Sequence, residues 1–442
     1  MVRHVTQRTS EIARLAPMTA VRYVRAMRLG SVLPGRARQG RAVLKFLTIA
    51  FVLSAAAAPT ALAQSAAQPW LPFARPNPFI TPLPAGVPVM GLAEQAANRA
   101  ELRTFVDHGV KVEQRKWTFT MYTVMKNGDI YDTAGRIKDS GVAFVKPTGP
   151  ITPLNEGIDR NDDLVGDGWP IASWMRADSG EGSLALFNPE TGAYGEMIGV
   201  PRGRGSFSYD WGGFIPNVRM SNGMNLPATP WWGPTAFGAQ IGGTYITDHE
   251  MRVAISNYQA GRYTEAYVPH LLAYEGYRHH PNQWYYPASK TDDMGTLVPE
   301  WGRGGNPDRL GHGLGLLRMG GIFRLDPSID VQQKIIGDGT AYGNMLARII
   351  ARTWQKYGAT MTDQTGAGFA LAAENVLTTK GTADRNSVSY GGGAVGAYGQ
   401  SWLRPMMYQI IDEGWVQWVE TGRNLEVDTG AAAPVGTYRP GP

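Results

Sequence analysis

Cysteine is absent from the 442 residues, and charged residues make up only 18% of the chain. Disulfides and thiolate zinc sites are therefore excluded. Hydrophobic residues make up 43%, which excludes an intrinsically disordered chain. Glycine (55) and proline (30) are both more frequent than usual, and at this density they disfavour a helical bundle. The composition is typical of a β-rich globular protein with many turns.

Several catalytic signatures are also missing. The chain has neither the His-Glu-x-x-His pattern of zinc proteases nor the Gly-x-Ser-x-Gly elbow of serine hydrolases. The Gly-rich segments 203–205 and 311–315 lack the strand–loop–helix context of a nucleotide site. The sequence shows no internal repeat with a period of 20–50 residues, so a repeat fold is not expected.

The net charge of +5 comes from the first 63 residues, which hold ten cations and one acid. The remainder has 32 cations and 36 acids, a net charge of −4, so nucleic acid is a poor candidate partner. The cationic stretch ends at Lys45, an apolar run follows over 46–58, and Ala61-Leu62-Ala63 has small-x-small cleavage chemistry. Residues 1–63 therefore predict a secretory signal with cleavage near Ala63, and a secreted or periplasmic protein.

An uncleaved anchor is the alternative for this leader, although 13 apolar residues are short for a bilayer. No later stretch approaches 18 apolar residues, so we expect no stable membrane insertion after cleavage. Residues 64–90 are proline-rich but carry large apolar groups, which predicts a strap on the domain surface. We expect a single β-rich domain over 91–425 and a flexible tail over 426–442.

Hydrophobic periodicity predicts the elements of this domain. Helices are expected over 93–108, 247–261 and 341–357, and strands over 117–125, 141–145, 183–187 and 193–200. Residues 359–373 read as a hairpin, and 402–418 fit either helix or strand. The predicted fold is α+β and mainly β, an antiparallel β-sandwich resembling a jelly roll with two or three peripheral helices.

Aromatic residues cluster in a way that suggests a glycan groove. Consecutive aromatics on a strand point to opposite faces, so one ring of each run can be exposed for stacking on a sugar. The alternative for each ring is packing in the core. The candidate substrate-binding residues are Trp211, Trp231, Trp232, Trp284 and Tyr285.

An acid-rich loop is a candidate cation site. Asp159, Asn161, Asp163 and Asp167 fall at positions 1, 3, 5 and 9 of a calcium loop, but Leu164 and Pro170 exclude an EF-hand. The loop predicts either a looser, structural calcium site or a polar turn whose side chains cap backbone groups. No cofactor is required for the chemistry considered next.

Hydrolysis of a glycosidic bond needs two carboxylates, one to protonate the leaving oxygen and one to activate water or attack the sugar carbon. The candidates are Glu196, Asp210, Asp292 and Asp293, together with His270 as an acid or base. Glu196 and Tyr194 are two residues apart on the strand expected over 193–200, so we expect them to share a face. Solvated charges, and for His270 a structural hydrogen bond, are the alternatives.

Segments over about 160–375 resemble a group of largely uncharacterised secreted bacterial proteins. The matching patterns are WGPTAFG at 232–238, PA-x-x-TD at 287–292, FRLDP at 323–327 and YG at 357–358, similar to WGATATG, PA-x-x-TD, FRLDP and YG in that group. Pro234 interrupts the first pattern, and Leu271-Leu272 replaces part of a HAL pattern after His270. The resemblance implies export, a β-sandwich-like domain and, by analogy, polysaccharide use.

The sequence thus predicts a secreted polysaccharide-active enzyme that hydrolyses glycosidic bonds, with a polysaccharide or oligosaccharide as partner. One alternative is a polysaccharide lyase, with His270 or a Tyr as base and Arg278 or Arg324 neutralising a uronate. The other is a non-catalytic carbohydrate-binding or envelope structural protein.

Overall fold

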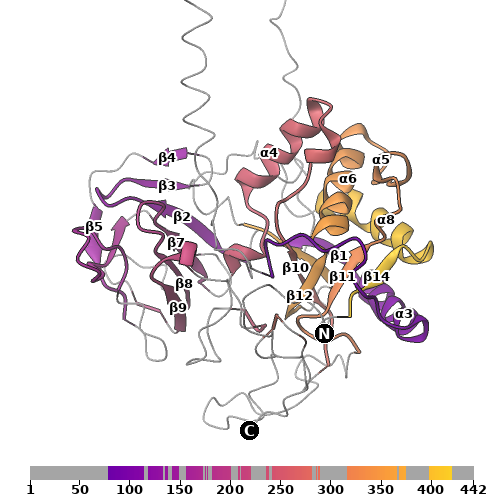
Figure 1. Ribbon diagram of the computed structural model, residues 1–442, viewed down its shortest axis with the longest axis horizontal. Coiled ribbons are helices and arrows are strands. Elements are labelled where there is room, and N and C mark those ends of the chain that lie inside the picture. The colour runs from indigo at the N-terminus through magenta and orange to yellow at the C-terminus, as the bar shows by residue number, and fades with distance from the viewer. Residues whose placement is uncertain are drawn as a thin grey trace, which may run out of the picture. The chain divides into compact units, whose positions relative to one another are not determined.

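The computed structural model describes most of the chain after the leader and strap (Figure 1). The described residues are 78–113, 118–132, 135–137, 142–148, 156–172, 175, 177, 182–200, 208–209, 211–220, 235–237, 241–280, 285, 287–288, 316–365, 368–374 and 398–420. All of them belong to one compact unit, Gln68–Pro442. The predicted signal and tail lie outside the described residues.

Six strands form the first sheet, which mixes parallel and antiparallel pairs. Their order is β1 (Val110–Glu113), β13 (Phe369–Ala372), β10 (Leu272–Gly276), β12 (Ala359–Gln364), β11 (Ile322–Leu325) and β14 (Val416–Trp418). β1 pairs with β13, and β10 with β12, in parallel, whereas the other three pairs are antiparallel.

A second sheet also has six strands in the described part of the chain. Their order is β4 (Gly135–Ile137), β3 (Ile130–Asp132), β2 (Thr120–Val124), β7 (Leu184–Phe187), β8 (Tyr194–Ile198) and β9 (Trp211–Ile215). Only the central pair, β2 with β7, is parallel. β5 (Val142–Val145) and β6 (Trp169–Ala172) form a separate antiparallel pair.

The α+β class is confirmed, but the antiparallel sandwich is not, because both six-stranded sheets are open and contain parallel pairs. The predicted hairpin over 359–373 is wrong. β12 and β13 do not pair with each other, since β10 lies between them, with Leu272 opposite Ala359 and Tyr274 opposite Leu371.

Five α-helices are present among the described residues, and local signals explain where they begin. They are α3 (Leu92–His108), α4 (Asp248–Gln259), α5 (Val331–Lys334), α6 (Ala341–Lys356) and α8 (Tyr398–Asp412). Thr247 caps α4 in a capping box with Glu250, and Thr340 accepts the Gly343 N–H at the start of α6. The segment 402–418, which fits either helix or strand in the sequence, contains both, because α8 ends at Asp412 and β14 begins at Val416.

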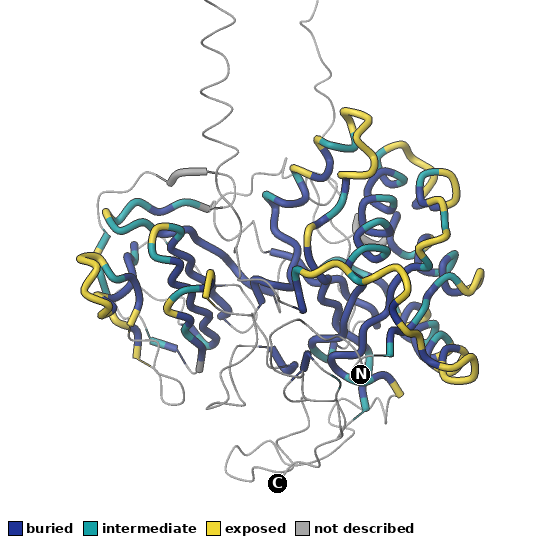
Figure 2. Tube along the Cα trace, in the orientation of Figure 1, coloured by how far each residue is buried: buried dark blue, intermediate teal, exposed yellow. Residues whose placement is uncertain are grey.

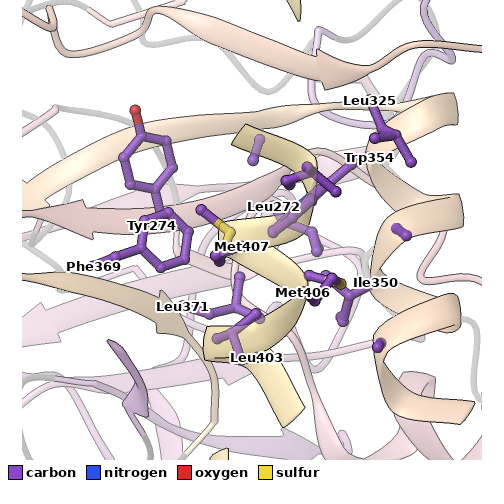
Figure 3. Close-up of a cluster of buried hydrophobic side chains, with 14 of the residues drawn as sticks. Leu272, Tyr274, Leu325, Ile350, Trp354, Phe369, Leu371, Leu403, Met406 and Met407 are labelled. Carbon is purple, nitrogen blue, oxygen red and sulfur yellow. The ribbon is translucent and has the colours of Figure 1, made fainter. Parts of the chain in front are cut away.

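Helices α3, α6 and α8 pack on strands of the first sheet, and α4 packs on α6, within one large apolar cluster. Figure 3 shows the part of this cluster that α6 and α8 form with the strands. Trp354 of α6 and Leu403, Met406 and Met407 of α8 are at most 2% exposed, as befits a close-packed core. Burial extends through both sheets: every residue of β7, β8 and β10 is buried, while exposed positions gather at turns and helix surfaces (Figure 2).

The described part of the proline-rich segment lies against this core. Phe79 is fully buried, and its carbonyl accepts the Leu271 N–H at 2.6 Å. The Leu83 N–H donates to the Lys356 carbonyl at 2.6 Å. Among the described residues, no helix combines the length and apolar character needed to cross a membrane.

Candidate functional site

A pocket of about 170 Å³ opens beside the end of β14 and the first turns of α3. We call it the Tyr285 pocket. Two rings, Tyr285 and Trp418, line it together with the polar side chains of Glu94, Asn98 and Arg318. The remaining lining is largely apolar and includes Met90, Ala97, Leu316 and Leu317. Aromatic faces beside a few polar groups are the usual composition of a small-ligand site.

Hydrogen bonds between distant segments hold the pocket walls. The side chain of Gln95, on α3, both accepts the Trp418 N–H at 2.7 Å and donates to the Trp418 carbonyl at 2.9 Å. The Tyr285 N–H donates to the Met319 carbonyl at 2.8 Å. Gly320 has a φ of +79°, and a Cβ there would clash with the Tyr285 carbonyl oxygen, so this close approach requires glycine.

Arg318 is the principal charge of the pocket. Its Nη1 donates to the Tyr285 hydroxyl, and its guanidinium carbon lies 4.7 Å from the Tyr285 ring centre. Burial lowers the pKa of Arg318, and the charge of Glu94 opposes that shift in part. The Nε atom is buried and has no hydrogen-bond partner among the described residues.

His280 lies near the pocket through its backbone. The backbone N–H of His280 donates to the carbonyl of Leu317, which lines the pocket, at 2.7 Å. Burial lowers the pKa of His280, and the charges of Arg318 and His279 lower it further. His280 is therefore a neutral ring near Arg318, which is the cation that lines the pocket among the described residues.

The predicted catalytic residue Glu196 lies elsewhere, in the interior. It is fully buried in the middle of β8, and its Oε1 accepts the Tyr194 hydroxyl and, at 3.1 Å, the Gly242 N–H. The contact with Tyr194 confirms that the two residues share a face. Burial raises the pKa of Glu196 to about 8, so the carboxyl is largely protonated at neutral pH. Among the described residues, no second carboxylate contributes to this shift.

His270 is also buried, and both of its ring nitrogens have partners. Nδ1 lies 2.8 Å from the Leu271 carbonyl oxygen, and Nε2 lies 3.2 Å from the carboxylate of Glu250. Burial lowers the pKa of His270, but the charge and hydrogen bond of Glu250 outweigh it, so the net shift is upward. In this geometry His270 holds the capping box of α4 against the sheet. Its catalytic role stays a prediction.

The side chains of the acid-rich loop form hydrogen bonds within the loop itself. Asp159, Asp163 and Asp167 accept backbone N–H groups of the loop at 2.8, 2.9 and 2.9 Å, and Asn161 donates to Asp163 at 3.0 Å. Among the described residues, no group of three or more His, Asp or Glu side chains could hold a metal ion. These contacts are those of the polar turn, and the calcium site stays a prediction.

The remaining predicted site residues are not described, or only in part. Asp210, Asp292, Asp293, Trp231, Trp232 and Trp284 lie outside the described residues, and only the backbone of Trp211 is described, within β9. The arginines named for the lyase have other partners: Arg278 pairs with Glu101, and Arg324 donates to Gln417 and to the Pro84 and Ala85 carbonyls.

Of the predicted site residues that the structure describes, only Tyr285 lines the pocket. Glu94, Arg318 and Trp418 were missed, since they come from segments far apart in the chain and share no local motif. Comparisons with protein-family models, with curated proteins and with solved structures find no match. Function must therefore be argued from the chemistry of the site.

Proposed function

We propose that the protein is a secreted polysaccharide-active enzyme that holds one sugar residue in the Tyr285 pocket. The observation that supports this most directly is the joint lining of the pocket by two aromatic rings and three polar side chains. Sugars present C–H faces that stack on rings and hydroxyls that need hydrogen-bond partners. Export is supported by the leader in the sequence.

The size of the pocket favours a single ring. A cavity of about 150 Å³ accommodates benzene, and about 170 Å³ leaves room for one ring with polar substituents. Asn98 offers both a donor and an acceptor, Glu94 offers acceptors, and Arg318 offers donors. A longer chain would extend from this pocket across the surface.

We further propose glycosidic hydrolysis as the reaction. Glu94 is the acid that lines the pocket among the described residues, and hydrolysis needs a second carboxylate. Asp292 and Asp293 follow Tyr285 closely in the chain and remain the predicted source of that group.

Product analysis tests the proposal. The protein, expressed from its full-length sequence, is incubated with neutral and uronate-containing polysaccharides, and new reducing ends are measured with the ultraviolet absorbance of unsaturated uronates. Reducing ends without absorbance support hydrolysis, and ends with absorbance replace hydrolysis with elimination. Retention on a polymer without any product would leave a binding protein. The absence of both product and retention would overturn the proposal.

A matched pair of variants ties the result to the pocket. Tyr285→Ala removes the stacking ring and is expected to lower polysaccharide cleavage about 10-fold. Tyr263→Ala removes a partly exposed ring outside the pocket and should leave cleavage unchanged. Equal rates for both variants would place the sugar elsewhere.

A further inference from the structure

We infer that the sugar residue held in the Tyr285 pocket is a uronate, whose carboxylate is bound by Arg318. This inference rests on the proposed function and names the substrate class of the same site. It starts from the guanidinium, because no ion pair joins Arg318 to a carboxylate among the described residues.

Arg278 shows how this protein satisfies a partly buried arginine. Its Nε lies 2.6 Å from Oε1 of Glu101 and its Nη2 lies 2.8 Å from Oε2, a bidentate pair. Arg318 instead donates from Nη1 to the neutral Tyr285 hydroxyl. A ligand carboxylate would be for Arg318 an ion-pair partner of the kind that Glu101 is for Arg278.

The charge of Arg318 attracts an anion to the pocket, where Glu94 is the carboxylate that acts on it among the described residues. Partial burial strengthens the attraction for an anion because solvent screens it less. A neutral sugar would offer Arg318 only hydroxyl acceptors, with less electrostatic gain.

The rest of the pocket favours a ring that carries the carboxylate. Tyr285 presents both its hydroxyl, next to the guanidinium, and its ring, which lines the same cavity. Asn98 and Glu94 stand at the lining as partners for ring hydroxyls. A uronate combines a C–H face, hydroxyls and a carboxylate in one residue. A non-sugar aromatic carboxylate shares only the anionic part of this chemistry.

Binding of paired ligands tests the inference. Ligand-observed NMR titrations of the full chain compare the methyl glycosides of glucuronate with glucose and of galacturonate with galactose, which differ only at the sixth carbon. Benzoate is the non-sugar carboxylate. We expect at least one uronate to bind at least about 10-fold more tightly than its neutral partner and more tightly than benzoate.

Two variants localise that preference. Arg318→Gln should reduce uronate affinity about 10-fold or more and abolish the preference over the neutral sugar. Arg352→Gln removes a partly buried arginine that lies outside the pocket, on α6, and should leave the preference intact. Thermal unfolding of both variants checks that they are folded, and the wild-type preference is informative without either variant.

The outcomes separate this inference from the proposed function. Equal binding of acidic and neutral sugars overturns the inference that the ligand is a uronate, but it leaves the proposal that the pocket binds a sugar. A uronate preference retained in Arg318→Gln overturns the role of Arg318. Tightest binding of benzoate, or no binding of any ligand, overturns the inference, while cleavage of polymers still decides the proposed function by itself.

Discussion

Glu196 and Glu250 are both buried glutamates, 0% and 5% exposed, and only one of them has a cationic partner. The carboxylate of Glu250 accepts the N–H and the hydroxyl of Thr247, at 3.1 and 2.8 Å, and lies 3.2 Å from the His270 ring. Glu196 has Tyr194 and Gly242 as donors, and its Oε2 has no partner among the described residues.

The comparison shows how partners decide the charge of a buried group. A carboxylate needs a cation or several donors to compensate for lost hydration. Glu250 and His270 compensate each other, and the pKa of His270 is raised accordingly. Glu196 has only neutral donors, so burial dominates and raises its pKa to about 8. One centre is an ion pair that anchors a helix, and the other is a protonated acid within a sheet.

The largest expected effect comes from breaking the ion pair. Glu250→Ala should lower the free energy of unfolding by about 3–5 kcal/mol, because it breaks the buried pair with His270 and removes half of the capping box. Urea unfolding at neutral pH measures this. The control is Glu265→Ala, at an exposed residue, with an expected change of about 0.5 kcal/mol or less. A loss for Glu250→Ala no greater than the control would contradict the comparison.

The next effect is the pH dependence of stability that a protonated Glu196 would cause. The pKa of Glu196 is about 8 when folded and 4.5 as its ordinary value. Between these values the folded state keeps a proton that the unfolded state has released. Stability therefore falls with rising pH, by about 1.4 kcal/mol per pH unit for this group.

Glu196→Gln removes that contribution. As the pH rises from about 5 to about 7, the wild type should lose about 3 kcal/mol of unfolding free energy relative to the variant. His270, whose raised pKa stabilises the fold fully below 6.5 and less as pH rises above it, acts equally in both proteins and cancels. Parallel pH profiles of wild type and variant would show that Glu196 is ionised when folded.

The smallest effect concerns the neutral part of the helix anchor. Thr247→Ala should cost about 1 kcal/mol, because the Glu250 N–H at the first turn of α4 loses its side-chain acceptor. Thr247→Ser keeps the hydroxyl and should retain most of that stability. Urea unfolding of the two variants side by side makes the measurement. Equal losses would assign the effect to the methyl group instead of the cap.

Much of the local structure was predictable. The helices expected over 93–108, 247–261 and 341–357 correspond to α3, α4 and α6, and the strands expected over 141–145 and 183–187 correspond to β5 and β7, each within about two residues at either end. Each depends on hydrogen bonds or contacts within a few residues, so the sequence window contains the whole cause. The shared face of Tyr194 and Glu196 follows from strand alternation in the same way.

The sheet order and the site were not predictable from those windows. A hairpin between β12 and β13 satisfies every local signal, yet β10, from almost 90 residues earlier, lies between them. Similarly, Gln95 and Trp418 hold the pocket together across 323 residues. Long-range pairings are chosen by burial of the whole core, which no short pattern encodes.

By itself, then, the sequence determined the absence of cysteine chemistry, the helices α3, α4 and α6, and strands such as β2, β5, β7 and β8, because periodicity and composition act locally. Only the tertiary structure decided which strands are neighbours, that Glu196 lies in the interior, and that Arg318 faces Tyr285 and Trp418. The physical reason is that burial and electrostatic environment are properties of the packed molecule, to which residues distant in the chain contribute together.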